Sequence, residues 1–198
     1  MRAALVTVIQ SAPVKPLRGK QSGATLWLTG LPSAGKTTLA LALAERLHER
    51  GVDVEILDGD EIRTHLSSGL GFSRVDRDVH VDRIGFVAEL LASHGVLVVV
   101  PVIAPYEQAR HKVREHHRAN GTRLLQVHVS TSVDVCAQRD VKGLYAKAFR
   151  GEISSMTGVD DPYEIPADPE LRIDTATVDR ADAVAQLLNL LVDQGVLE

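Results

Sequence analysis

The sequence contains a single cysteine, Cys136, among its 198 residues. One cysteine excludes an internal disulfide framework and fits a reducing compartment. Long apolar runs are also missing, since no stretch approaches the roughly 18 residues that cross a bilayer. The apolar part of the first 16 residues is too brief for an ordinary signal peptide. We therefore expect a cytoplasmic protein that is not anchored in a membrane.

An excess of basic residues is absent as well. Lysines and arginines number 22 against 26 acidic residues, which gives a formal net charge of −4. This balance disfavours a general binder of nucleic acid or of an anionic membrane surface, although a single cleft can still be basic. The length suits one domain, and the hydrophobic share of 44% is enough for a sizeable core.

Strand-like and helix-like segments alternate along the chain. Apolar, β-favouring runs predict strands at 24–29, 52–57, 96–103, 124–131 and 171–175, and helical patterns predict helices at 37–50, 79–95, 106–121, 133–140 and 179–195. Such alternation indicates parallel βαβ units. We predict a three-layer α/β/α fold whose mostly parallel sheet has about five strands.

Two segments stand outside this alternation. Residues 1–22 form an N-terminal extension with proline and glycine interruptions, within which 4–10 is a candidate short strand. The predicted domain therefore spans 23–198. A long polar segment, rich in glycine, proline and aspartate, separates the last two predicted strands.

The connection between the first strand and its helix is GLPSAGKTT. It matches G-x-x-x-x-G-K-[ST] in the strand–loop–helix context that a phosphate loop requires. Small residues let backbone N–H groups approach phosphate oxygens closely, and the helix N-terminus adds positive charge. We predict a P-loop NTPase fold, with Lys36 on the β- and γ-phosphates and the Thr37 hydroxyl on Mg²⁺. The predicted nucleotide-binding residues of this loop are Gly30, Leu31, Pro32, Ser33, Ala34, Gly35, Lys36, Thr37 and Thr38.

The residues after the second predicted strand favour a small-molecule kinase among P-loop proteins. LDGDEIR places Asp58, Asp60 and Arg63 at the carboxyl end of that strand, where open α/β sheets bind ligands. Two carboxylates there can accept a proton from an attacking hydroxyl and hold waters of Mg²⁺. Arg63 and the arginines that follow it can hold an anionic acceptor.

Four motifs together resemble the adenylylsulfate (APS) kinase family over about residues 23–175. They are WLTGLPSAGKTT, DGDEIR, GLGFSRVDRD and KGLYAKAFRGEISSMTGVDDPYE, in this order. The family phosphorylates the 3′-hydroxyl of APS to give PAPS in sulfate assimilation. The resemblance implies ATP, Mg²⁺, a small nucleotide-like acceptor, a homodimer and a mobile lid over about 142–168.

The resemblance also assigns roles on the donor side. Asp58 matches the general base, and Asp60 lies beside it near the metal. Mg²⁺ would then be held by Thr37 and, through water, by Asp58 or Asp60. Lys36 is the catalytic cation, and Arg139 matches a residue near the ATP base.

On the acceptor side, Arg63 and Arg77 match arginines that hold the phosphosulfate of APS. Phe72 matches an aromatic residue that stacks on the adenine. Lys142 and Leu144 open the lid, where Lys142 would approach the acceptor. Closure of this lid would exclude water, which competes as a phosphoryl acceptor.

Departures from the family pattern concentrate on the acceptor side. His80 stands where an acceptor-contacting asparagine is expected, and Ala104 replaces a serine in the loop that also contains Ile103. Met156 replaces a phenylalanine that would complete the adenine sandwich, although methionine can still pack on a purine. Tyr106 is a further candidate for the acceptor pocket.

These departures leave two alternatives to an APS kinase. The first is a related enzyme that phosphorylates a different hydroxyl acceptor, such as a nucleoside, a nucleotide or a biosynthetic intermediate. The second is a catalytically silent ATP-binding partner protein, which the retained Lys36, Thr37, Asp58 and Lys142 disfavour.

The remaining histidines and the cysteine predict no metal site. His116 and His117 are expected on a solvated helix face, and His128 in the core. Cys136 is expected to be a small buried side chain, far in sequence from any zinc-ligand spacing.

Overall fold

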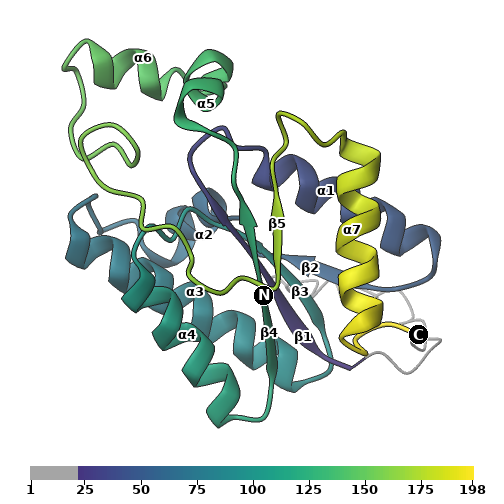
Figure 1. The fold of residues 1–198 in the computed structure, drawn as a ribbon. Coiled ribbons are helices and arrows are strands. Elements are labelled where there is room, and N and C mark those ends of the chain that lie inside the picture. Colours follow the sequence, from purple (N-terminus) through teal and green to yellow (C-terminus); the bar gives the residue numbers. More distant parts are fainter. Residues whose placement is uncertain (1–21) are drawn as a thin grey trace, which may run out of the picture.

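The computed structural model describes residues 22–198 (Figure 1). The candidate strand at 4–10 and all of the predicted extension except Ser22 lie outside the described residues. Within the described part, no helix is long and apolar enough to cross a membrane.

The strands form one sheet, in which every pairing between described strands is parallel. Their order is β2-β3-β1-β4-β5. This arrangement confirms the predicted parallel sheet and its five strands. The strands are β1 Ala24–Gly30, β2 Val54–Ile56, β3 Leu97–Pro101, β4 Arg123–Val129 and β5 Leu171–Ile173.

Helices cover both faces of the sheet, which confirms the three layers. α1 and α7 lie on one face, and α3 and α4 lie on the other (Figure 1). The helices of the described chain are α1 Lys36–Glu49, α2 Gly59–Leu66, α3 Arg74–Ser93, α4 Glu107–Ala119, α5 Val133–Arg139, α6 Leu144–Phe149 and α7 Arg180–Asp193.

The core has two parts, one on each face of the sheet. Side chains alternate along β1 because successive residues of a strand point to opposite faces. Leu26 and Leu28 join the cluster that includes α1 and α7 residues, while Trp27 joins the cluster formed with α3 and α4. All three side chains are buried, so both helical layers are anchored on the central strand.

Two short helices were not predicted, and a third begins earlier than expected. α2 and α6 lie in segments for which no helix was predicted, and α3 begins at Arg74 rather than at residue 79. Short polar helices give too short a pattern to be recognised, but N-cap residues mark the starts of α2 and α3. The Asp58 carboxylate accepts from the Asp60 N–H before α2, and the Ser73 hydroxyl accepts from the Asp76 N–H in α3.

The carboxyl ends of the strands carry the segments that build the site. α5 and α6 stand beyond this edge of the sheet, and the chain after α6 runs back along the sheet to β5 (Figure 1). The loop between β1 and α1 and the start of α2 follow strand ends at the same edge, as parallel strands require.

Candidate active site

The loop between β1 and α1 has a backbone that requires glycine at two positions. Gly35, just before α1, has φ of 99°, in the left-handed region. A Cβ at Gly30 would lie 2.4 Å from the carbonyl oxygen of Val129 on the neighbouring strand. Both positions therefore exclude larger residues. The loop leads into the N-terminus of α1, where free N–H groups and the helix dipole favour a phosphate.

Lys36 is folded back over this loop. Its Nζ donates to the carbonyl oxygens of Gly30 at 3.0 Å and Leu31 at 2.8 Å, and the residue is only 8% exposed. Burial lowers the pKa of Lys36 to about 8, although the carboxylates of Asp60 and Asp58 favour its charged form. A polyphosphate would supply the negative charge that this buried ammonium lacks.

Asp58 links the phosphate loop to α2. Its Oδ2 accepts a hydrogen bond of 2.8 Å from the Thr37 hydroxyl, and its Oδ1 accepts one of 2.9 Å from the Asp60 N–H. The second bond caps α2 and fixes the carboxylate at the helix start. The hydroxyl and the carboxylate therefore lie side by side, and both are hard oxygen ligands suited to Mg²⁺.

Two arginines hold the ring of Phe72 at the mouth of the site. The Cζ atoms of Arg63 and Arg77 lie 4.9 and 5.6 Å from the ring centroid, and Phe72 is 58% exposed. Arg77 also donates through Nε to the Phe72 carbonyl at 2.9 Å. Burial, with the nearby Arg77 charge as the next cause, lowers the pKa of Arg63. An anionic ligand between the two cations would relieve this repulsion.

The loop between β3 and α4 is held from both sides. The Thr29 hydroxyl donates to the carbonyl of Ile103 at 2.6 Å, and Arg110, 1% exposed, donates to the carbonyl of Ala104 at 2.6 Å. Ala104 has φ of 41°, a conformation that costs free energy in any residue with a Cβ. The surrounding hydrogen bonds maintain this strained loop against the site.

One cavity of about 830 Å³ joins these groups. It extends from the phosphate loop, past the start of α2, to the Arg63–Phe72–Arg77 group and the start of the predicted lid. Predicted site residues that line it are Pro32, Ser33, Gly35, Lys36, Thr37, Thr38, Asp58, Asp60, Arg63, Phe72, Arg77, His80, Ile103, Ala104, Arg139, Lys142 and Leu144.

Five other predicted site residues do not line this cavity. Gly30, Leu31 and Ala34 belong to the phosphate loop but are buried behind its surface. Tyr106 is 1% exposed, and its hydroxyl donates to the Asp161 carboxylate at 2.9 Å. Met156 is 6% exposed and packs in the core cluster that contains Leu31, so the structure does not bring its side chain to the cavity.

His80 lines the cavity, but both of its ring nitrogens are engaged within the protein. Nε2 lies 3.0 Å from the Gly59 carbonyl oxygen, and Nδ1 lies 3.0 Å from the Ser67 hydroxyl. Burial, reinforced by the Arg63 charge, lowers the pKa of His80 to about 4. The neutral ring therefore has no free N–H for a ligand.

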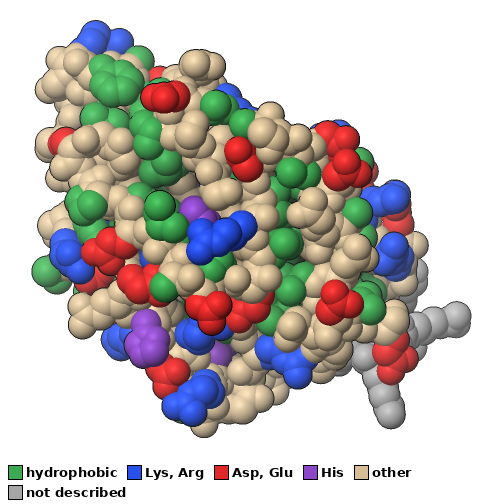
Figure 2. Space-filling model, in the orientation of Figure 1, with side chains coloured by type: hydrophobic (Ala, Val, Ile, Leu, Met, Phe, Trp, Pro, Cys, Tyr) green, Lys and Arg blue, Asp and Glu red, His purple; other side chains and the backbone are tan. Residues whose placement is uncertain are grey.

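The start of the predicted lid touches the acidic residue next to Asp58. Lys142 forms an ion pair with Asp60, and both side chains are largely exposed. Beyond it, the surface over α5 and α6 carries hydrophobic side chains (Figure 2), among them Phe149. An exposed ion pair contributes little to stability, on the order of 0–1 kcal/mol, so this contact is easily broken when a ligand enters.

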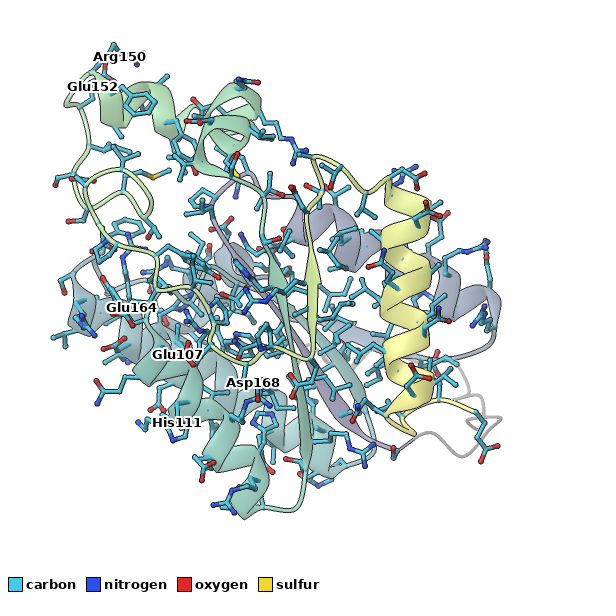
Figure 3. The ribbon with its side chains drawn as sticks, viewed as in Figure 1. Glu107, His111, Arg150, Glu152, Glu164 and Asp168 are labelled. Atoms are coloured by element: carbon cyan, nitrogen blue, oxygen red, sulfur yellow. The ribbon has the colours of Figure 1, made fainter. Side chains whose placement is uncertain are left out.

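The C-terminal part of the predicted lid is hydrogen-bonded to the start of α4. Glu164 accepts a hydrogen bond of 2.7 Å from the Glu107 N–H, and Figure 3 shows these two residues close together where α4 begins. Tyr106, the N-cap residue, makes no side-chain cap of its own, so Glu164 caps this helix from a distance in sequence. Arg150 and Glu152, in contrast, lie at the outer end of the segment (Figure 3).

The cavity also includes residues that the sequence analysis did not predict. Thr175, Val178 and Arg180 line it after β5, near Arg139. Arg139 donates to the hydroxyl and the carbonyl of Thr175 at 2.7 and 2.8 Å. The sequence could have predicted them, because residues that follow the last parallel strand must lie at the same sheet edge as those that follow the other strands.

The prediction for His117 was wrong. The residue is 0% exposed, with Nδ1 2.9 Å from the Val113 carbonyl and Nε2 2.9 Å from the Thr25 hydroxyl. Burial lowers its pKa to about 4. His128 and Cys136 are buried, as predicted, and the described residues contain no group of three or more ligand side chains that could hold a metal.

Comparisons with known proteins agree on one family. The family model described as "Adenylylsulphate kinase" matches residues 22–174. The adenylyl-sulfate kinase of Chloroflexus aurantiacus is 53% identical over 171 residues, which are 86% of this chain and 90% of that protein. The adenylyl-sulfate kinase of Rippkaea orientalis is 48% identical over 180 residues, covering 90% and 96% of the two chains.

A solved structure also matches most of this chain. The Mycobacterium tuberculosis APS kinase CysC, in complex with AMPPNP and APS, superposes with a TM-score of 0.84 at 39% identity. The match covers 87% of this chain and 99% of that one.

Proposed function

The chain belongs to the adenylylsulphate kinase family, and from this membership we propose that it transfers the γ-phosphoryl group of ATP to the 3′-hydroxyl of APS, giving PAPS. The observation that carries the proposal is the single cavity that joins the phosphate loop to the Arg63–Phe72–Arg77 group. In-line phosphoryl transfer requires the donor and the acceptor next to each other in one space, and a single cavity of this kind supports the proposal.

The donor would bind with its phosphates on the loop before α1. Lys36 would leave the carbonyls of Gly30 and Leu31 to contact the β- and γ-phosphates. The base of ATP would lie at the other end of the cavity, near Arg139, Val178 and the residues that follow β5.

Asp58 would act as the general base. Its carboxylate lies at the capped start of α2, where it can orient the 3′-hydroxyl and take its proton. The paired oxygens of Thr37 and Asp58 fit Mg²⁺, and exposed Asp60 can hold a water of the metal. When bound there, Mg²⁺ would neutralise charge on the β- and γ-phosphates.

The acceptor would occupy the end of the cavity formed by Phe72 and its two arginines. The exposed Phe72 ring would stack on the adenine, and Arg63 and Arg77 would hold the phosphosulfate. Lys142 would exchange its contact with Asp60 for the acceptor. The Ile103–Ala104 loop, which lines the same cavity, would form part of its wall.

The segment from about 142 to 168 would serve as a lid. Its closure over the two nucleotides would exclude water from the γ-phosphate. Met156, which packs in the core, would reach the acceptor only if this segment moves.

A coupled assay of ADP release with ATP and APS tests the proposal. We expect APS-dependent ADP release that equals the PAPS formed, and loss of turnover in Lys36→Ala. Lys112→Ala is the matched control, because Lys112 is exposed and pairs with Asp82 away from the cavity. ADP release without APS dependence, or turnover only with another hydroxyl compound, would overturn the assignment of APS. No turnover with any acceptor would favour a silent ATP-binding protein.

We further propose that the protein is a cytoplasmic homodimer, as the family resemblance and the single cysteine suggest. Light scattering of the purified full chain measures the mass in solution. A monomer mass of 21.4 kDa would contradict the dimer.

A further inference from the structure

We propose that His80 is a positioning residue that holds helix α2, and with it Asp58, in the geometry required for phosphoryl transfer. The catalytic part of this inference rests on the proposed function. Its structural part, that His80 fixes α2, stands on the hydrogen bonds alone.

His80 connects α3 to both ends of α2. Its Nε2 lies 3.0 Å from the carbonyl oxygen of Gly59, the first residue of the helix. Its Nδ1 lies 3.0 Å from the hydroxyl of Ser67, the C-cap residue of the same helix. α2 has only eight residues; Gly59 is buried and Ile62 is partly buried against the core cluster on this face, so few apolar contacts hold the helix. The histidine is therefore a main attachment of α2 to the layer of α3 and α4.

The chemistry of the two partners determines the protonation of the ring. A carbonyl oxygen can only accept, so Nε2 carries the hydrogen. The neutral ring then accepts at Nδ1 from the Ser67 hydroxyl, which can donate. Burial lowers the pKa of His80 to about 4, in agreement with this neutral form. Both nitrogens are used, and the imidazole is not available to bind the acceptor directly.

Gly59 transmits this attachment to the reacting groups. It lies between Asp58, the N-cap, and Asp60, which pairs with Lys142. A Cβ at Gly59 would lie 3.1 Å from Cγ2 of Val102, so this peptide is already in close contact with the β3 end of the sheet. His80 holds the carbonyl of the same peptide.

Loss of this hydrogen bond would allow the start of α2 to shift. The carboxylate of Asp58 would shift with it, because its N-cap bond moves with the helix. A displacement of about 1 Å in a reacting group can reduce a rate about 100-fold.

Arg83 supports the other end and explains why His80 acts chiefly through Gly59. Arg83 donates to the Leu66 carbonyl and lies 3.5 Å from the Ser67 hydroxyl. The C-terminal end of α2 therefore keeps a second attachment when His80 is replaced. The N-terminal end, next to Asp58, receives no other side-chain hydrogen bond from α3 among the described residues.

Variants of His80 separate positioning from direct binding. His80→Ala removes both hydrogen bonds, whereas His80→Gln can place an amide N–H where Nε2–H now lies. We expect His80→Ala to lower kcat by about 10- to 100-fold with KM for APS within about threefold, and His80→Gln to recover most of that loss. His94→Ala is the control, because His94 is an exposed histidine at the end of the same helix.

A double-mutant cycle with Asp58→Asn tests the route of the effect. If His80 acts through Asp58, then adding His80→Ala to Asp58→Asn will lower kcat by less than about threefold further. Independent, multiplicative losses would overturn the proposal. So would a rise in KM for APS with unchanged kcat, which indicates direct contact with the acceptor, or an equal loss in the Ala and Gln variants.

Hydrogen exchange of the protein without substrates gives a readout that does not depend on activity. We expect the amides of α2 to exchange at least about 10-fold faster in His80→Ala, with α4 and α7 unchanged and the Gln variant close to the parent. Unchanged exchange in α2 would overturn the inference. A parent protein that exchanges as expected but does not phosphorylate APS would overturn only the proposed function.

Discussion

The Thr37 hydroxyl donates a hydrogen bond of 2.8 Å to Oδ2 of Asp58. Thr37 belongs to the first turn of α1, after the phosphate loop, and Asp58 caps α2. The bond therefore joins the element that would bind the phosphates of ATP to the element that would orient the acceptor hydroxyl. If Mg²⁺ binds here, the Thr37 hydroxyl oxygen would be a ligand and Asp58 would hold one of its waters.

Replacement of this carboxylate should affect the reaction more than ATP binding. Asp58→Asn keeps an oxygen for the N-cap bond, places an amide NH₂ that can donate to the Thr37 hydroxyl, and removes the base. We expect kcat to fall by about 10²- to 10⁴-fold, with KM for ATP within about threefold. Steady-state kinetics measures both, and Asp82→Asn is the control at an exposed aspartate. Equal losses of kcat and ATP affinity would indicate a metal-binding role instead.

Affinity for ATP should fall above about pH 8. Burial lowers the pKa of Lys36 to about 8 from 10.5, so the ammonium loses its proton above that pH in the free protein. The phosphates of ATP bind the charged form. We expect affinity to decrease by up to about tenfold per pH unit above pH 8, until the pKa of the bound lysine is reached.

Calorimetric titration with a non-hydrolysable ATP analogue between pH 7 and pH 10 measures this dependence. Lys36→Arg, whose side chain stays charged, should remove it. An unchanged slope in that variant would assign the titration to another group.

Removal of the Phe72 ring should weaken APS binding alone. Stacking of a base on an aromatic side chain is worth about 1–3 kcal/mol, so Phe72→Ala should raise KM for APS by about 5- to 150-fold. KM for ATP should not change, because the ring lies at the proposed acceptor end of the cavity. Phe86→Ala is a close control, since Phe86 is 57% exposed, against 58% for Phe72, and does not line the cavity. Similar effects of both variants would contradict the stacking role.

The free energy of unfolding should decrease as the pH falls from about 6.5 to 4, partly through His117. Burial lowers its pKa from 6.5 to about 4 in the folded protein. Between these values the unfolded chain binds more protons, so stability is present above pH 6.5 and is lost toward pH 4. The full effect is on the order of 3 kcal/mol for one fully buried histidine.

Urea titrations at several pH values test whether the free energy of unfolding decreases as the pH falls. His117→Gln should be less stable at neutral pH but should show a shallower decrease below pH 6.5. His116→Gln, at the neighbouring and more exposed position, should keep the parent slope. The same slope in all three proteins would exclude His117 as a source of acid sensitivity.

Much of the fold was predictable because its signals are local. The continuous apolar run of β3 and the helical spacing in α7 indicated buried elements before any contact was known. α2 escaped prediction because its eight residues carry only two apolar side chains at helical spacing, Ile62 and Leu66, which is too short a pattern to recognise. Its position depends on His80 and Arg83 from another helix.

The candidate site residues also divide into those whose position follows from local sequence and those whose position depends on tertiary packing. Lys36, Asp58 and Arg63 each follow a strand end closely in sequence, so the sheet alone places them at one edge. Tyr106 also follows a strand end, but packing buries its side chain and that of Met156 away from the cavity, and the sequence does not reveal this.

The sequence by itself determined the phosphate loop, because its small residues and Lys36 lie within one short stretch between a strand and a helix. Only the tertiary structure decided that both nitrogens of His80 bond to α2, and that His117 is buried against Thr25. Hydrogen bonds between residues that packing brings together produce no periodic pattern in the sequence, so they cannot be predicted from it. A histidine in a polar run reads the same in sequence whether its ring meets water, a substrate or another helix.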